Sequence, residues 1–269
     1  MRKKYIYLTG LLFLTLFGAC NEEEVQPFSE KPGVNFMERY MSGSNITWGN
    51  GYTNLKTSLD FTSLYSSGQY GITEGDITLR VQLEGLLSET PLKVRFKVLP
   101  VEGYDLPHIT VPEEGVEIKA GEYHADAVFV YKRPETLDKE YQAAIAIDYE
   151  HSDVVAGTAE RQTYTLIIQD SFTWEDMSVE SKVEWDTHFV PIIGAYGPEK
   201  VRFLMYAFGT IGKSLKDVCW YTVNNYYPIY YGLQKYMPQV REALATYNAE
   251  HPDSPAQEAD GTPITFPEP

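Results

Sequence analysis

The sequence predicts a mainly β fold: an antiparallel β-sandwich over residues 34–170, followed by a smaller helix-containing region over 171–269. Short runs of alternating apolar and polar residues, divided by turn residues, recur through the first part, as is typical of half-buried strands. In the second part the alternation stops, and apolar residues recur at helical spacing, which predicts helices that pack on one face. No long helical pattern interrupts the strands, so a parallel α/β fold is disfavoured.

Alternation predicts strands over 34–37, 55–65, 77–83, 92–98, 116–122, 124–131, 141–149 and 163–168. We expect 77–83 and 92–98 to join in a hairpin-like connection, because glycine and proline separate them. The strands 116–122 and 124–131 should be coupled, since a Gly-Glu pair lies where the chain must reverse. Residues 42–51 are rich in glycine, serine and asparagine and are expected to form a loop.

The C-terminal region contains two predicted helices. Pro198 at the first helical position and Gly209 at the end mark the first, although the apolar run between them is also compatible with a strand. The second is expected from Pro238 to His251, where apolar residues recur at i, i+3, i+4 and i+7. These are Val240, Ala243, Leu244 and Tyr247. The proline-rich tail over 253–269 should be extended and irregular.

The first residues indicate export. A basic start, an apolar run over 5–17 and the small pair Gly18-Ala19 precede Cys20, and the run is shorter than the roughly 20 residues of a membrane span. Residues 1–19 therefore resemble a bacterial lipoprotein signal peptide, in which Cys20 becomes the lipidated first residue of the mature chain. A transmembrane anchor and an ordinary cleaved signal are the alternatives. The chain has only 2 cysteines, so a disulfide framework does not explain Cys20.

Three acids directly follow the expected lipidation site. Glu22, Glu23 and Glu24 resemble the export signal that moves Bacteroidetes lipoproteins to the outer face of the outer membrane. They also fit a solvated tether, predicted over 20–33 as an acidic, proline-containing spacer; both interpretations can hold. The predicted location is the extracellular face of the outer membrane, anchored through Cys20.

The charge of the chain excludes one class of partner. With 38 acidic against 22 basic residues and a net charge of −16, the chain lacks the basic surface that nucleic acids require. Electrostatic adhesion to anionic lipid is disfavoured for the same reason, so the acyl chains would hold the protein at the membrane. We therefore predict a lipid anchor as a partner and no nucleic acid.

Catalytic and metal-binding motifs are absent from the sequence. None of the 5 histidines has another at i+3 or i+4, and neither HExxH nor CxxC occurs, so no metal and no cofactor are predicted. No GxSxG elbow or phosphate loop is present. The stretch Glu150-His151-Ser152-Asp153 could be a metal-site or triad fragment, but a solvated turn between two strands is the favoured interpretation. We expect no catalytic residues and no enzyme activity.

Several motifs together resemble a family of unknown function among Bacteroidetes surface lipoproteins, the PKD-like lipoproteins. They are Cys20 with its acids, the strand-turn motif 116–122, the acidic turn after Ile168, Trp174, the stretch 196–203 and the closing stretch 260–267. The resemblance implies an accessory subunit that accompanies SusC/SusD-type importers, and it implies no catalytic residues. The Gly-Glu turn also recurs in Calx-β and other immunoglobulin-like sandwiches, so it implies that the sandwich is immunoglobulin-like.

An aromatic stretch is the strongest candidate for contact with a ligand or partner. Its aromatic residues are Trp220, Tyr221, Tyr226, Tyr227, Tyr230 and Tyr231. Such rings stack on sugars, but a core or an intersubunit contact is the favoured interpretation of the cluster. Trp48 is a weaker candidate, with packing on the sandwich as its alternative. Cys219 is expected to be a buried, inert thiol.

These observations lead to one expected function and two alternatives. We expect a surface lipoprotein that acts as an accessory subunit of a SusC/SusD-type TonB-dependent importer of nutrients, with an oligosaccharide or a peptide as the ligand. A free-standing, glycan-binding surface protein is the second hypothesis, and a hydrolase the third.

Overall fold

The structure is a computed structural model that describes residues 31–42, 44–51, 53–224 and 232–268. The chain divides into two units, 1–31 and 32–269, and the description below concerns the second. Cys20 and the acids Glu22, Glu23 and Glu24 lie outside the described residues, so their roles stay predictions. In the part of the chain that the structure describes, no helix has both the length and the apolar character needed to cross a bilayer.

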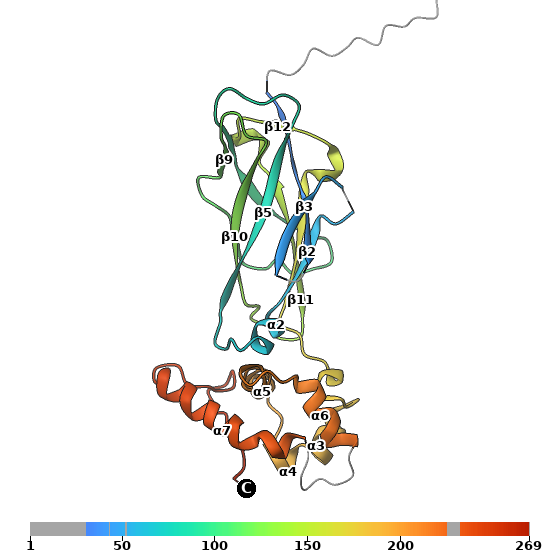
Figure 1. Ribbon diagram of the computed structural model, residues 1–269, viewed down its shortest axis with the longest axis vertical. Coiled ribbons are helices and arrows are strands. Elements are labelled where there is room, and N and C mark those ends of the chain that lie inside the picture. The colour runs from blue at the N-terminus through green and yellow to red at the C-terminus, as the bar shows by residue number, and fades with distance from the viewer. Residues whose placement is uncertain (1–30, 43, 52, 225–231, 269) are drawn as a thin grey trace, which may run out of the picture. The chain divides into compact units, whose positions relative to one another are not determined.

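Two main sheets form the sandwich, which confirms the prediction of a mainly β fold. The first sheet has the order β12-β1-β5-β10-β8 and the second β4-β13-β11-β7. The first contains β1 (Gly33–Phe36), β5 (Glu74–Glu84), β8 (Ile109–Thr110), β10 (His124–Lys132) and β12 (Val155–Ala156). The second contains β4 (Lys56–Asp60), β7 (Phe96–Pro100), β11 (Glu140–Ile147) and β13 (Thr163–Gln169). Figure 1 shows β5 and β10 as long strands side by side.

The apolar core lies between these sheets. The alternation predicted for 77–83 is confirmed, since Ile77, Leu79, Val81 and Leu83 are all buried in β5. Phe96 of the second sheet reaches across to the first, where its ring centroid lies 5.1 Å from that of Phe129. Burial of such aromatic and branched side chains is the main stabilising contribution to a sandwich of this size.

The strand pairing differs from the prediction in its connections. Residues 77–83 and 92–98 do not form a hairpin, because β5 pairs with β1 and β10. The run 92–98 is split at Arg95 into β6 (Leu92–Val94) and β7, which pair with β9 (Val116–Ile118) and β11. The break has a cause far along the chain: the Arg95 backbone N–H donates to Ser152 Oγ at 2.9 Å and therefore leaves the ladder.

The predicted coupling of 116–122 with 124–131 is correct only at the turn. Gly121 has φ +76°, and the N–H of Glu122 donates to the carbonyl of Lys119 at 3.0 Å, so the chain reverses where expected. However, β9 pairs with β6, and β10 pairs with β5 and β8. The sandwich is also not purely antiparallel, because β1 pairs parallel with β12 and β4 parallel with β13.

Two predictions near the N-terminus are wrong. The expected loop over 42–51 belongs largely to a hairpin of β2 (Glu38–Ser42) and β3 (Asn45–Gly49). The strand expected over 55–65 ends at Asp60, and α2 (Phe61–Ser66) follows. The Asp60 carboxylate accepts from the backbone N–H of Thr62 at 3.0 Å, an N-cap that redirects the chain into a helix.

The C-terminal region is helical. Its elements are η3 (Trp174–Met177), α3 (Lys182–His188), α4 (Val190–Ile193), α5 (Pro198–Thr210), α6 (Leu215–Asn224) and α7 (Leu233–Glu250), whereas η1 (Tyr149–His151) and η2 (Ala159–Arg161) belong to the sandwich loops. The predicted helix start at Pro198 is confirmed. Pro238 does not open the last helix but lies inside α7. The predicted face of α7 is confirmed, since Val240 and Tyr247 are buried and Ala243 and Leu244 pack on the core.

A buried ionic cluster lies at the end of the last strand. Asp170 follows β13, and its side chain and that of Arg202 in α5 are both 0% exposed. Arg202 Nε donates to Asp170 Oδ1 at 2.5 Å, while Arg133 Nε and the Tyr65 hydroxyl donate to Oδ2 at 2.5 and 2.7 Å. The cluster therefore links the ends of β10 and β13 with α2 and α5.

Candidate functional site

The helix α6 divides the aromatic stretch into an inward and an outward face. Leu215, Val218, Cys219 and Thr222 are buried, at the i, i+3, i+4 and i+7 spacing of one helical face. Trp220 and Tyr221 point away from this face and are 50% and 53% exposed. Their rings contact each other edge to face, with centroids 5.2 Å apart.

The structure describes two of the six predicted contact residues, Trp220 and Tyr221. The exposure of Trp220 and Tyr221 excludes a core position for these two residues, and an intersubunit contact or a ligand contact remains as the prediction. Tyr226, Tyr227, Tyr230 and Tyr231 lie outside the described residues. The helical spacing of the buried set could have shown this from sequence, but treating the stretch as one aromatic cluster concealed it.

A depression of about 730 Å³ lies beside the exposed pair. Its lining residues are Gly212, Lys213, Ser214, Asp217, Val218, Trp220, Tyr221, Gly232, Lys235 and Tyr236. They come from the turn before α6, from α6 itself and from the start of α7. Aromatic rings combined with a few polar groups are the composition of a small-molecule or sugar site.

Gly232 sets the geometry between α6 and α7. It has φ +77°, and a Cβ there would lie 2.2 Å from Thr222 Oγ1, so a larger residue would clash. The same Thr222 hydroxyl accepts from the N–H of Leu233 at 2.8 Å, which ties the first residue of α7 to α6. This hydrogen bond therefore fixes the start of α7 beside α6, at the depression.

The remaining aromatic and thiol candidates have structural roles. Trp48 of β3 packs under the guanidinium of Arg80, and Arg80 Cζ lies 5.0 Å from the centroid of the Trp48 ring. This contact agrees with the alternative that Trp48 packs on the sandwich. Cys219 is fully buried beside Met177, with the two sulfurs 3.7 Å apart. The prediction that this thiol is buried is confirmed, and burial raises its pKa well above the ordinary value, which disfavours the reactive thiolate.

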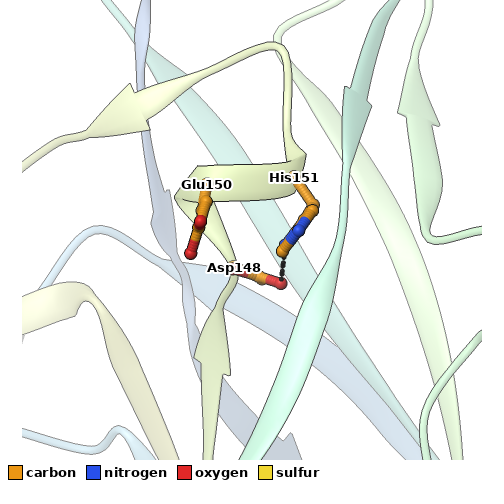
Figure 2. A group of neighbouring side chains, drawn as sticks. All are labelled: Asp148, Glu150 and His151. Atoms are coloured by element: carbon orange, nitrogen blue, oxygen red, sulfur yellow. Dashed lines mark hydrogen bonds and ion pairs between the residues drawn. The ribbon is translucent and has the colours of Figure 1, made fainter.

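Figure 2 shows Asp148, Glu150 and His151, whose potential ligand atoms lie within 4.8 Å of one another. Asp148 Oδ2 is 2.7 Å from His151 Nδ1, and Oδ1 is 3.6 Å from the ammonium of Lys97. The hydrogen bond with His151 is the largest influence on Asp148 and holds its pKa below the ordinary value. Asp148 is thus engaged by an imidazole and by an ammonium group, which would compete with a metal ion.

The neighbouring residues of this turn support the sandwich. Ser152 Oγ donates to the carbonyl of Asp148 at 2.7 Å, and Asp153 Oδ2 accepts from the N–H of Lys93 at 2.9 Å. The serine and aspartate are therefore used in backbone contacts and do not complete a triad with His151.

Comparison with known proteins gives only partial likenesses. No family model matches the chain, and no curated protein shows significant similarity to it. A Bacteroides ovatus protein to which carbohydrate binding is ascribed is 11% identical, with TM-score 0.37 over 53% of this chain and 38% of that one. A Bacteroides thetaiotaomicron protein solved with a Man5GlcNAc product is 13% identical, with TM-score 0.33 over 44% of this chain and 29% of that one.

The Calx CBD1 domain in its apo form is 14% identical, with TM-score 0.28 over 36% of this chain and 84% of that domain. The present chain thus spans well under half of either Bacteroides chain. At such TM-scores the likenesses carry no argument about function, which must come from the site itself.

Proposed function

We propose that this chain is a surface lipoprotein that binds an oligosaccharide and serves a SusC/SusD-type TonB-dependent importer as an accessory subunit. Cys20 carries the acyl anchor, and Glu22, Glu23 and Glu24 direct export to the outer face of the outer membrane. The sandwich is a rigid spacer, and the depression beside Trp220 is the binding site. The protein has no enzymatic role in this proposal.

The exposed pair Trp220 and Tyr221 is the observation that supports sugar binding. Both rings are half exposed on a helix whose other face is buried, and they border a depression with hydroxyl, ammonium and carboxylate groups. A sugar ring stacks its apolar face on an aromatic ring and directs its hydroxyls to such polar groups. Asp217 is the one carboxylate that lines the depression among the described residues, whereas most glycosidases use two.

Affinity electrophoresis of the mature chain tests the binding role. The chain should migrate more slowly through gels that contain the polysaccharide it recognises, because the protein does not move while it is bound to the polymer in the gel. Unchanged migration in every gel of a broad polysaccharide panel would contradict oligosaccharide binding.

The accessory role predicts a stable complex in the membrane. Affinity-tagged protein at native expression, isolated from detergent-solubilised outer membranes, should recover a SusC/SusD-like pair identified by mass spectrometry. A tagged, unrelated surface lipoprotein is the control for carry-over of abundant membrane proteins. Recovery of the lipoprotein alone would contradict the accessory role and leave the free-standing glycan-binding protein as the alternative.

The anchor predicts a complete change of location on a single substitution. Cys20→Ser removes the thiol that carries the acyl chains. Without the acyl chains, the folded part of the protein has no affinity of its own for the membrane. The variant should leave the membrane fraction, whereas Cys219→Ser should remain there because that thiol is buried. Membrane retention of Cys20→Ser, measured by fractionation and immunoblotting, would show that another segment anchors the chain.

A further inference from the structure

Two lysines converge on one ring at the rim of the depression. The ammonium groups of Lys213 and Lys235 lie 6.0 and 5.3 Å from the ring centroid of Tyr236. Lys213 is in the turn after α5, whereas Lys235 is in the first turn of α7, so two separate segments bring positive charge to the same place. The Tyr236 ring is supported from the core side by Phe208, whose centroid is 6.1 Å away at an interplanar angle of 86°.

Neither ammonium is neutralised by a carboxylate in the described part of the chain. The lysines found in ion pairs there are Lys93, Lys97, Lys139, Lys182 and Lys216. Lys216 makes the contrast local, because it pairs with Glu175 at 2.9 Å only three positions along from Lys213. The undescribed stretch 225–231 between α6 and α7 contains no acidic residue.

This positive charge is unusual for its surroundings. The chain carries 38 acidic and 22 basic residues, so its overall field repels anions. Asp217 also lines the depression, which leaves two ammonium groups against one carboxylate at the site. A local excess of uncompensated cations beside stacking rings favours a ligand that has both a ring face and a negative charge.

We infer that the depression selects an acidic oligosaccharide, one whose sugar rings carry carboxylate or sulfate groups. The inference rests on the proposed function and names the class of glycan. A sugar ring stacks on Trp220 or on Tyr221, whose rings are nearly perpendicular, while Lys213 and Lys235 bind the anionic groups of the oligosaccharide through charge-assisted hydrogen bonds. Asp217 accepts from sugar hydroxyls and disfavours an anionic group at its own position.

Matched polymers separate charge from shape. The mature chain is run through gels of polygalacturonate, alginate and chondroitin sulfate. It is also run through gels of the same polymers without their negative charge: the carboxylates are methyl-esterified or reduced, and the sulfate groups of chondroitin sulfate are removed. We expect retardation by at least one acidic polymer, weaker retardation by its neutralised form, and a decrease as salt rises. Equal retardation by charged and neutralised polymers, or retardation by neutral glycans alone, would overturn the inference and leave oligosaccharide binding intact.

Substitutions identify the two lysines as the source of the selectivity. The double variant Lys213→Gln/Lys235→Gln should lose about tenfold in affinity for the acidic polymer and keep its affinity for the neutralised one. Lys216→Gln is the control, because its ammonium is engaged by Glu175. Acid selectivity that survives in the double variant would reject the assignment, whereas a wild-type chain retarded by no gel of the broad polysaccharide panel would refute the proposed function itself.

Discussion

Replacing Asp170 by alanine should lower the free energy of unfolding by about 3–5 kcal/mol. The side chain is fully buried between two arginines, and alanine would leave Arg202 as a buried charge without its principal partner. The hydroxyl of Tyr65 would lose its 2.7 Å hydrogen bond as well. Removal of one member of a buried ionic cluster costs far more than the pair contributes when intact, because the remaining charge stays desolvated.

Urea unfolding followed by far-UV circular dichroism measures this loss. The control is Asp126→Ala, which removes the exposed ion pair with Arg80 at 2.6 Å and should cost about 0–1 kcal/mol. If Asp170→Ala costs no more than Asp126→Ala, the ionic cluster does not hold the strands to α5 as described. If only the helices lose their signal at lower urea, the two parts unfold separately.

Much of the fold follows from local pattern. The alternation over 77–83 and 163–168 predicts strands because one face of each must be buried, and both became central parts of their sheets. Pro198 predicts a helix start because its fixed φ and missing N–H suit the first helical position. These features depend on neighbours in sequence, so one sequence is enough to identify them.

The pairing of the strands could not be read in the same way. Residues 92–98 alternate like a continuous strand, but the hydrogen bond from the Arg95 N–H to Ser152 divides the run between two sheets. The strand expected through Tyr65 stops because Asp60 caps α2. Such outcomes depend on partners far along the chain, or on a cap that competes with alternation, and neither appears in the periodicity of the segment.

The candidate site shows a similar division. Its residue types were identifiable, since Trp220 and Tyr221 belong to a conspicuous aromatic stretch. Their exposure depends on the rotation of α6, which is set by Leu215, Val218 and Cys219 on the opposite face. Lys213 and Lys235 are 22 positions apart and meet only because the chain returns at Gly232, so no sequence spacing marks them as a pair.

Loss of the exposed aromatic pair should abolish most of the oligosaccharide binding. Trp220→Ala removes the larger stacking surface, and Trp220→Ala/Tyr221→Ala removes both rings. We expect a loss of at least about tenfold for the single variant, equivalent to about 1.4 kcal/mol, and a larger loss for the double variant. Stability should change little, because half of each side chain is already in solvent.

The sugar site on α6 is tested by two dissociation constants, those of the wild-type chain and of the Trp220→Ala variant. Both are measured with the polysaccharide that retards the wild type most. The matched control is Tyr123→Ala, which removes a ring that is 51% exposed on the sandwich, away from the depression. We predict that Trp220→Ala loses the binding and that Tyr123→Ala keeps it, with both variants folded as judged by circular dichroism. Wild-type affinity in Trp220→Ala would contradict a sugar site on α6.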